Sequence, residues 1–264
     1  CGMSAAFAAV FGTPMAAAVF AMEVASVGVM YYAALLPCVI AAIIAAEFAT
    51  GMGIDPETFP VHSIPGLTVE TGLKMALIAV GCGILSILFC ILLKIVGQLY
   101  TKYLKNPYIR IVVAAGVIIL ITICLNTKDY MGAGSGLIAR AIENGEAGPL
   151  DFLWKMLLTA LTMRAGYRGG EIVPAFSVGV TFGCVAGGIL GFSPELAAAA
   201  GMVALFCGVT NCPITAMLIS FELFGFSGAA YYLIAISISY AVSGYYSLYK
   251  DQTIVYLSLI HISE

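Results

Sequence analysis

Long uncharged apolar runs alternate with shorter polar segments along the whole chain. Runs of this length are typical of α-helices that cross a lipid bilayer. Pro37 lies inside the first run and is expected to kink or break its helix. The runs cover residues 24–46, 75–93, 111–126, 172–194 and 223–249. The pattern predicts an all-α polytopic membrane protein.

The polar segments between the runs differ in charge, and the difference predicts an orientation. The linker 94–110 carries four basic residues and no acid, whereas the loop 51–70 carries three acids and no Lys or Arg. The positive-inside rule therefore places the linker in the cytoplasm and the loop outside. Leu137–Ile142 should form a short amphipathic helix, and residues 151–163 a half-span.

The overall composition narrows the function classes. The chain is 62% hydrophobic and 9% charged, so it has little room for a soluble domain, and its net charge of −3 gives no reason to expect nucleic acid. The eight cysteines show no C-x-x-C spacing, which favours small apolar packing residues over metal ligands. Only His62 and His261 are present, without an H-E-x-x-H motif. An intramembrane enzyme is the alternative least supported by these residues, and we predict no enzyme activity and no cofactor.

The stretch from Gly166 to Gly183 organises the chain. Arg168 precedes two glycines, Glu171 and Pro174, and no further charge follows before Glu195. Proline suits the first turn of a helix, and the unpaired N–H groups of a helix N-terminus attract anions. Inside a membrane, an interrupted helix that points its N-terminus at a ligand is a recurring feature of transporters. The alternative is a plain loop-to-helix junction.

An internal repeat supports the transporter interpretation. Pro14 and Glu23 recur as Pro213 and Glu222, and both pairs are separated by 199 positions. The same offset relates several neighbouring small and aromatic residues. Repeated broken helices are typical of inverted-repeat transporters, although two Ala-rich helices can also match by coincidence. Glu23 and Glu222 then either cap a neighbouring helix, face an interface or carry protons.

Several motifs together resemble the CLC family of chloride channels and proton-coupled anion transporters. Gly170-Glu-Ile-Val-Pro174 is similar to the family's G-x-F-x-P anion-binding motif. Residues 11–23 are similar to its N-A-P-L-A-G-x-x-F-x-x-E helix, and residues 211–222 to the counterpart in its second half. Tyr256 stands at the position of the family's pore tyrosine. The resemblance covers residues 2–256 in the family's order.

The resemblance implies a CLC-type inverted-repeat fold with tilted, broken helices, an integral protein of a bacterial plasma membrane, and a homodimer with one anion pathway per subunit. Small apolar residues along 14–47 and 213–246 suit a closely packed dimer face, whose helices carry Pro14, Glu23, Pro213 and Glu222. The anion, chloride or fluoride, would be bound by Gly170, Glu171, Ile172 and Tyr256.

Both ends of the chain depart from the family pattern. The family's G-S-G-I-P and G-R-E-G-P motifs, with the pore serine and the external gating glutamate, would lie upstream of Cys1, so we expect a transmembrane domain at 1–256 that lacks much of its first repeat. Residues 257–264 match a translated sequencing adapter. We expect these eight residues to be an artefact.

Two departures concern the substrate. An acid at Glu171 looks like the fluoride/proton-exchanging branch, whose motif reads G-G-E-V-T-P, but Val173 replaces its threonine. Val24 stands where many chloride/proton exchangers carry an internal glutamate, which fits the fluoride branch or a passive channel. A carboxylate beside an anion site competes for the same N–H donors, and its protonation frees them. Burial raises the pKa of a carboxyl group, so such a linkage can operate near neutral pH. We therefore predict a proton-coupled antiporter in which Glu171 couples the two ions, with a passive chloride channel as the alternative.

Overall fold

The computed structural model describes residues 1–54, 56, 58–249 and 252–254, and these residues form eleven α-helices, one 3₁₀ turn and two short strands. The elements in the first part are α1 (Gly2–Phe11), α2 (Pro14–Glu23), β1 (Ser26–Val27), η1 (Tyr32–Ala34) and α3 (Leu35–Gly51). The long middle part contains α4 (Val69–Tyr103), α5 (Pro107–Leu125), α6 (Ser135–Glu143), α7 (Asp151–Ala165) and α8 (Ile172–Ile189). The last part contains α9 (Pro194–Thr210), α10 (Pro213–Phe224), α11 (Ala229–Ser243) and β2 (Thr253–Ile254).

Four helical segments of the described chain are long and apolar enough to cross a membrane, which confirms the all-α polytopic prediction. They are Tyr32–Gly51, Val69–Tyr103, Pro107–Leu125 and Ile172–Ile189. The short amphipathic helix around Leu137–Ile142 is also confirmed, as α6.

The first expected span was placed wrongly. Residues 24–31 are not helical, and the apolar helix α3 begins only at Leu35. Pro37 therefore lies in the first turn of α3, where its missing N–H would have had no partner within the helix, so it does not interrupt the helix.

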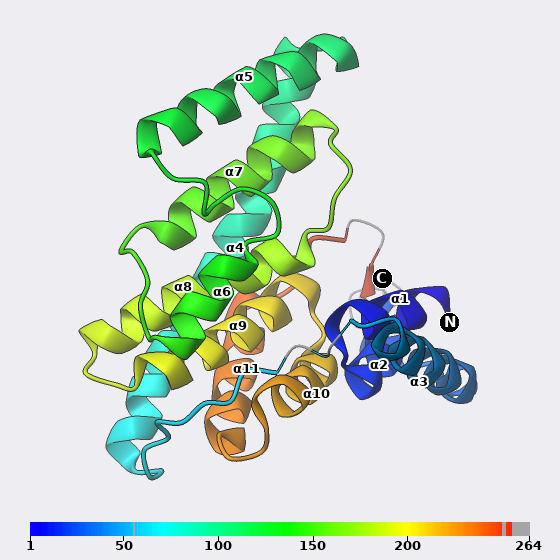
Figure 1. Cartoon of the computed structure of the whole chain (residues 1–264), viewed down its shortest axis with the longest axis vertical. Coiled ribbons are helices and arrows are strands. Elements are labelled where there is room, and N and C mark those ends of the chain that lie inside the picture. The colour runs from blue at the N-terminus through cyan, green and yellow to red at the C-terminus, as the bar shows by residue number, and fades with distance from the viewer. Residues whose placement is uncertain (55, 57, 250–251, 255–264) are drawn as a thin grey trace, which may run out of the picture.

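The helices form a small and a large group (Figure 1). Helices α1, α2 and α3 pack on one another beside the larger group, and α10 contacts α2. The long helix α4 runs along the larger group and packs against α11, α9 and α7, while α5 lies at the outer edge on α7 (Figure 1). A parallel pairing of β1 with β2, with Ser26 opposite Thr253, connects the N-terminal group to the end of the described chain. The sequence patterns did not predict these strands.

Helix α9 is the centre of the fold. Every residue from Leu196 to Thr210 is buried. Helix α8 packs closely on it because glycines recur every four residues along the contacting face, at Gly179, Gly183 and Gly187. A Cβ atom at Gly179 would lie 2.5 Å from the carbonyl oxygen of Gly201 on α9. Small residues at this spacing let two helix backbones approach each other, as in other membrane helix pairs.

Replacing Gly183 with Ala should destabilise the protein by about 1–3 kcal/mol, because the added methyl group meets the backbone of Ala197 and forces the two helices apart. Gly188 on the same helix is the matched control, since a Cβ there meets nothing within 4 Å. Gly188→Ala should leave stability unchanged or raise it by up to about 1 kcal/mol. Thermal unfolding of both variants in detergent tests this prediction, and equal midpoints would contradict it.

The two copies of the internal repeat adopt the same backbone. Gly12 and Asn211 both take left-handed conformations, with φ 67° and 57°, and end α1 and α9. The next residues, Thr13 and Cys212, share φ −117° and ψ 74° as the N-caps of α2 and α10. The 199-residue offset therefore relates two helix–break–helix units of equal geometry.

The two units also cap each other. The carboxylate of Glu23, at the end of α2, accepts hydrogen bonds from Ile214 N (3.0 Å) and Thr215 N (2.8 Å) at the start of α10. Glu222, near the end of α10, accepts in return from Met15 N and Ala16 N at the start of α2, each at 2.9 Å. Because each helix end meets the other's beginning, α2 and α10 lie antiparallel, as an inverted repeat requires. Of the roles left open for the two glutamates, helix capping is the one that the structure supports.

Candidate functional site

The central stretch forms a break between two helices. Helix α7 ends at Ala165, and its C-cap Gly166 has a φ of 112°, which favours glycine. Residues 167–170 are not helical, and α8 begins at Ile172. Arg110 fixes the end of α7, because its Nε donates to the carbonyl oxygen of Ala165 at 2.8 Å. Pro174 lies in the first turn of α8, as predicted.

The N-terminus of α8 presents free backbone donors. Glu171 is the N-cap residue, and its side chain makes no capping hydrogen bond. Within the described part of the chain, no group accepts a hydrogen bond from the N–H of Glu171 or Ile172. These N–H groups and the partial positive charge of the helix end favour an anion. The predicted helix N-terminus with unpaired N–H groups at Glu171 and Ile172 is thus present, and anion binding there stays a prediction.

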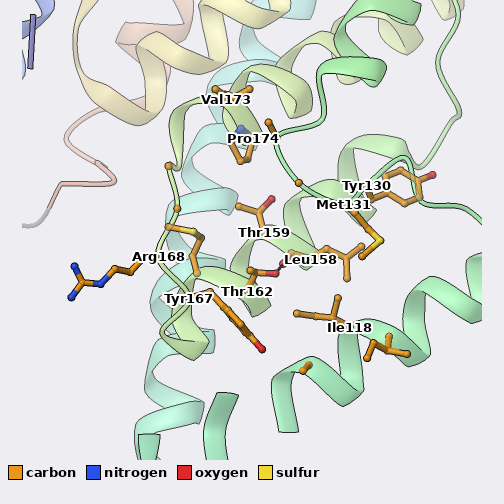
Figure 2. Close-up of a pocket in the computed structure, with 17 residues that line it drawn as sticks. Ile118, Tyr130, Met131, Leu158, Thr159, Thr162, Tyr167, Arg168, Val173 and Pro174 are labelled. Atoms are coloured by element: carbon orange, nitrogen blue, oxygen red, sulfur yellow. Dashed lines mark hydrogen bonds between the residues drawn. The ribbon is translucent and has the colours of Figure 1, made fainter. Parts of the chain in front are cut away.

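A cavity of about 530 Å³ adjoins this N-terminus. Figure 2 shows Val173 and Pro174 on one side of it and the α7 side chains Thr159 and Thr162 nearby. The backbone of Gly169 and Gly170 completes this wall, while the Arg168 side chain points away from the other labelled residues (Figure 2). The opposite wall comes from α5 and from the segment before α6. The cavity is therefore mainly apolar, with the helix end as its polar element.

The Glu171 side chain does not line this cavity, although its chain neighbour Gly170 does. Its Oε1 lies 3.5 Å from Nη2 of Arg164, and the two side chains are 20% and 25% exposed. Arg164 in turn packs over Gly97 on α4. The carboxylate is thus a half-buried partner of a guanidinium, one residue away from the free N–H of Ile172.

Sequence reasoning missed a buried lysine next to the site. Lys155 on α7 is 1% exposed, and its Nζ donates to the carbonyl oxygens of Gly132 (2.8 Å) and Tyr130 (3.2 Å). Ser177 on α8 bonds the same segment through the carbonyl of Ala133 at 3.1 Å. The ammonium group therefore fixes the segment that forms one wall of the cavity. The signal was present, because Lys155 is the only charge between Asp151 and Arg164.

Asp151 also helps to fix the segment before α6. The hydroxyl of Tyr130 donates to Asp151 Oδ1 at 2.7 Å, and Gly148 N donates to Asp151 Oδ2 at 2.7 Å. Burial, followed by the hydrogen bond to Asp151, raises the pKa of Tyr130 well above its ordinary value. The phenol therefore stays protonated and keeps donating at all physiological pH values.

The remaining predicted residues fall into two sets. Tyr256 lies outside the described residues, as does the segment 257–264. Pro14 and Pro213 begin α2 and α10, and Glu23 and Glu222 cap the opposite helix within one chain. A role of these helices at a dimer face stays a prediction. Several large apolar side chains of α3, among them Leu36, Ile44 and Phe48, are exposed.

The sequence of this chain is similar to those of known proteins. A family model described as voltage gated chloride channel matches residues 1–244. A chloride/fluoride channel protein of Pseudomonas syringae pv. tomato is 32% identical over 262 residues, which cover 96% of this chain and 57% of that protein. The H(+)/Cl(-) exchange transporter ClcA of Vibrio cholerae is 29% identical over 238 residues, 84% of this chain and 50% of that protein.

Solved structures show the same fold. The crystal structure of a CLC-type fluoride/proton antiporter matches with a TM-score of 0.92 at 32% identity, over 96% of this chain and 64% of that one. A eukaryotic CLC transporter matches with a TM-score of 0.66 at 20% identity, over 96% of this chain and 44% of that one, a likeness of fold alone. The chain thus spans 50–57% of the length of the curated relatives given above.

Proposed function

This chain belongs to the voltage-gated chloride channel (CLC) family, whose members are channels and transporters, and on that premise we propose that it takes part in proton-coupled anion transport across a membrane. The single observation that carries the proposal is the broken helix at 166–172, where free N–H groups and an ionisable side chain meet. Such an arrangement provides both an anion site and a group that can carry a proton.

The anion site that we propose is the N-terminus of α8. The N–H groups of Glu171 and Ile172 would donate to the ion, Gly170 would let it approach the backbone, and the hydroxyl of Tyr256 would complete the coordination. A glycine at 170 suits this role, because a Cβ there would meet nothing within 4 Å and the space beside the backbone is open.

The proton-coupling group that we propose is Glu171. Its carboxylate is one residue from the free N–H of Ile172, so a rotation of the side chain brings it into competition with the anion. Protonation removes the negative charge, ends the competition and weakens the pairing with Arg164. Occupancy of the site by an anion and uptake of a proton by Glu171 then favour each other, as reciprocal linkage requires.

We propose fluoride as the preferred anion, with chloride as the alternative. An acid at 171 supports fluoride, and so does similarity to proteins whose names include fluoride. Val173, in place of threonine, supports chloride instead. Val24 is a buried apolar residue and offers no internal proton acceptor at that position, which suits fluoride exchange or the second candidate, a passive anion channel.

Ion efflux from liposomes tests the proposed function. The full-length protein that carries this sequence is reconstituted, and fluoride and chloride efflux are recorded while the internal pH is followed. We expect fluoride to leave faster than chloride and protons to move in the opposite direction. Chloride moving equally well would favour the chloride alternative, and anion efflux without proton movement would favour the channel.

The assembly that we propose is a homodimer in a bacterial plasma membrane. The exposed apolar face of α3 and the adjoining α2–α10 pair supply a surface of the kind that membrane helices bury against a second copy. Single-molecule counting of labelled subunits in bilayers tests this assembly. A monomer at all protein densities would contradict it.

A further inference from the structure

A second cavity shares no lining residue with the cavity at the start of α8, and basic side chains are part of its lining. Its volume is about 680 Å³, and it lies between α4, the end of α7 and residues 245–248. Its lining includes Lys94, Arg110 and Arg164. We propose that this cavity binds a phosphate group.

The three cations come from three different parts of the chain. Lys94 shares one face of α4 with Gly97 and Thr101, which also line the cavity, because residues three, four and seven positions apart point the same way. Arg164 lies over Gly97, where an added Cβ would be 3.4 Å from its Cδ. Arg110 lies beside Gly166, where a Cβ would be 3.4 Å from its Nη2. Both arginine side chains therefore lie close to the backbone of a glycine.

Positive charge at this cavity exceeds negative charge. Among the described residues, one of the three cations has an acidic partner: Arg164 lies 3.5 Å from Glu171. Lys94 has no ion-pair partner in the described part of the chain, and Nε of Arg164 is buried without a hydrogen-bond acceptor. Arg110 uses its Nε on the carbonyl of Ala165, which leaves its terminal nitrogens available. An anion would satisfy these donors.

The chemistry of the lining favours a phosphate group over a halide. A guanidinium group can donate hydrogen bonds to two oxygens of a phosphate at once, whereas a spherical halide ion offers no such pair of acceptors. Thr101, Tyr245 and Ser247 add hydroxyl groups around the same cavity, whose volume far exceeds that of one halide ion. The cavity also adjoins the basic linker that the charge pattern assigns to the cytoplasm. Basic pockets between membrane helices on that side typically take phospholipid headgroups, and soluble phosphates are present there too.

Occupancy of this cavity would also affect the α8 site. A phosphate that engages Arg164 competes with its pairing to Glu171, because one guanidinium serves both sites. We therefore expect phosphate binding to change the proton dependence of transport. This consequence rests on the proposed function, whereas phosphate binding itself does not.

Phospholipid retention tests the proposal without any transport assay. The full-length protein is titrated in detergent with phosphatidylglycerol, phosphatidylcholine or inorganic phosphate, and binding is read by native mass spectrometry and by the shift of the unfolding midpoint. Lys94→Gln should weaken phosphatidylglycerol or phosphate binding about fivefold, the effect of one cation near an anionic surface. Lys94 is exposed, so the variant should fold normally.

Lys102→Gln is the matched control. Lys102 is an exposed lysine on the same helix that does not line the cavity, so its loss should change binding less than twofold. Phosphatidylglycerol binding that depends on Lys94 identifies a lipid headgroup, and Lys94-dependent binding of inorganic phosphate alone identifies a soluble ligand. Equal losses of binding in Lys94→Gln and Lys102→Gln, or no binding of phosphatidylglycerol or of inorganic phosphate, would overturn the proposal. If the protein shows Lys94-dependent binding but does not transport anions, the result counts against the proposed function and not against the phosphate site.

Discussion

Glu171→Gln is expected to stop proton movement while anion efflux continues or slows. Glutamine has nearly the same size as glutamate and lies among the same neighbours. It cannot take up and release a proton, and it loses the ion pair with Arg164. The competition between the side chain and the anion then no longer depends on pH. Proton flux into fluoride-loaded liposomes should fall to the level of protein-free liposomes. Anion efflux measured at pH 6 and pH 8 should become equal.

Two further variants make this result specific. Glu143→Gln makes the same chemical change at an exposed position at the end of α6 and should leave proton flux unchanged. Glu171→Asp keeps the titratable group on a shorter side chain, so it should retain part of the coupling. Normal coupling in Glu171→Gln would remove this residue from the mechanism and would leave the anion site at α8 without a proton carrier.

The sequence predicted the break points of the fold better than its helix boundaries. Pro14, Pro213 and Pro174 each lie in the first turn of a helix, because a residue without an N–H loses nothing there. The same rule explains the misplaced first span. Pro37 also occupies a first turn, but the uncharged run around it hid the eight non-helical residues that precede η1 and α3. Apolar composition shows that a segment is buried in lipid or protein and does not show where its helix begins.

Contacts between distant segments were beyond the sequence patterns. The pairing of β1 with β2 joins residues more than 200 positions apart through backbone groups, which no side-chain pattern encodes. Lys155 was visible as a lone charge, yet its role depends on the carbonyl groups of Gly132 and Tyr130, whose approach is a tertiary event. Glu171, by contrast, was predicted because a charge at the start of an apolar helix is costly wherever the rest of the chain lies.

Glu23→Ala should destabilise the protein by about 3 kcal/mol, because it leaves the buried N–H and hydroxyl of Thr215 without an acceptor. Glu23 is 6% exposed and accepts from the N–H groups of Ile214 and Thr215 and, at 2.6 Å, from the hydroxyl of Thr215. A loss of this size lowers the unfolding midpoint of a domain of this length by roughly 6–12 °C. Thermal unfolding in detergent measures it, with Glu143→Ala at an exposed site as the control.

Glu222→Ala should cost less than Glu23→Ala, because Glu222 is only half-buried and accepts two hydrogen bonds, whereas Glu23 is buried and accepts three. The double variant tests whether the reciprocal caps act as a unit. If each cap stabilises its own end of the α2–α10 pair independently, the two losses add; if loss of one lets the pair separate, the second costs little. Glu23→Gln distinguishes capping from proton transport. A less stable protein with an unchanged proton-to-anion ratio supports capping, whereas a stable protein that no longer moves protons would assign Glu23 to the transport mechanism.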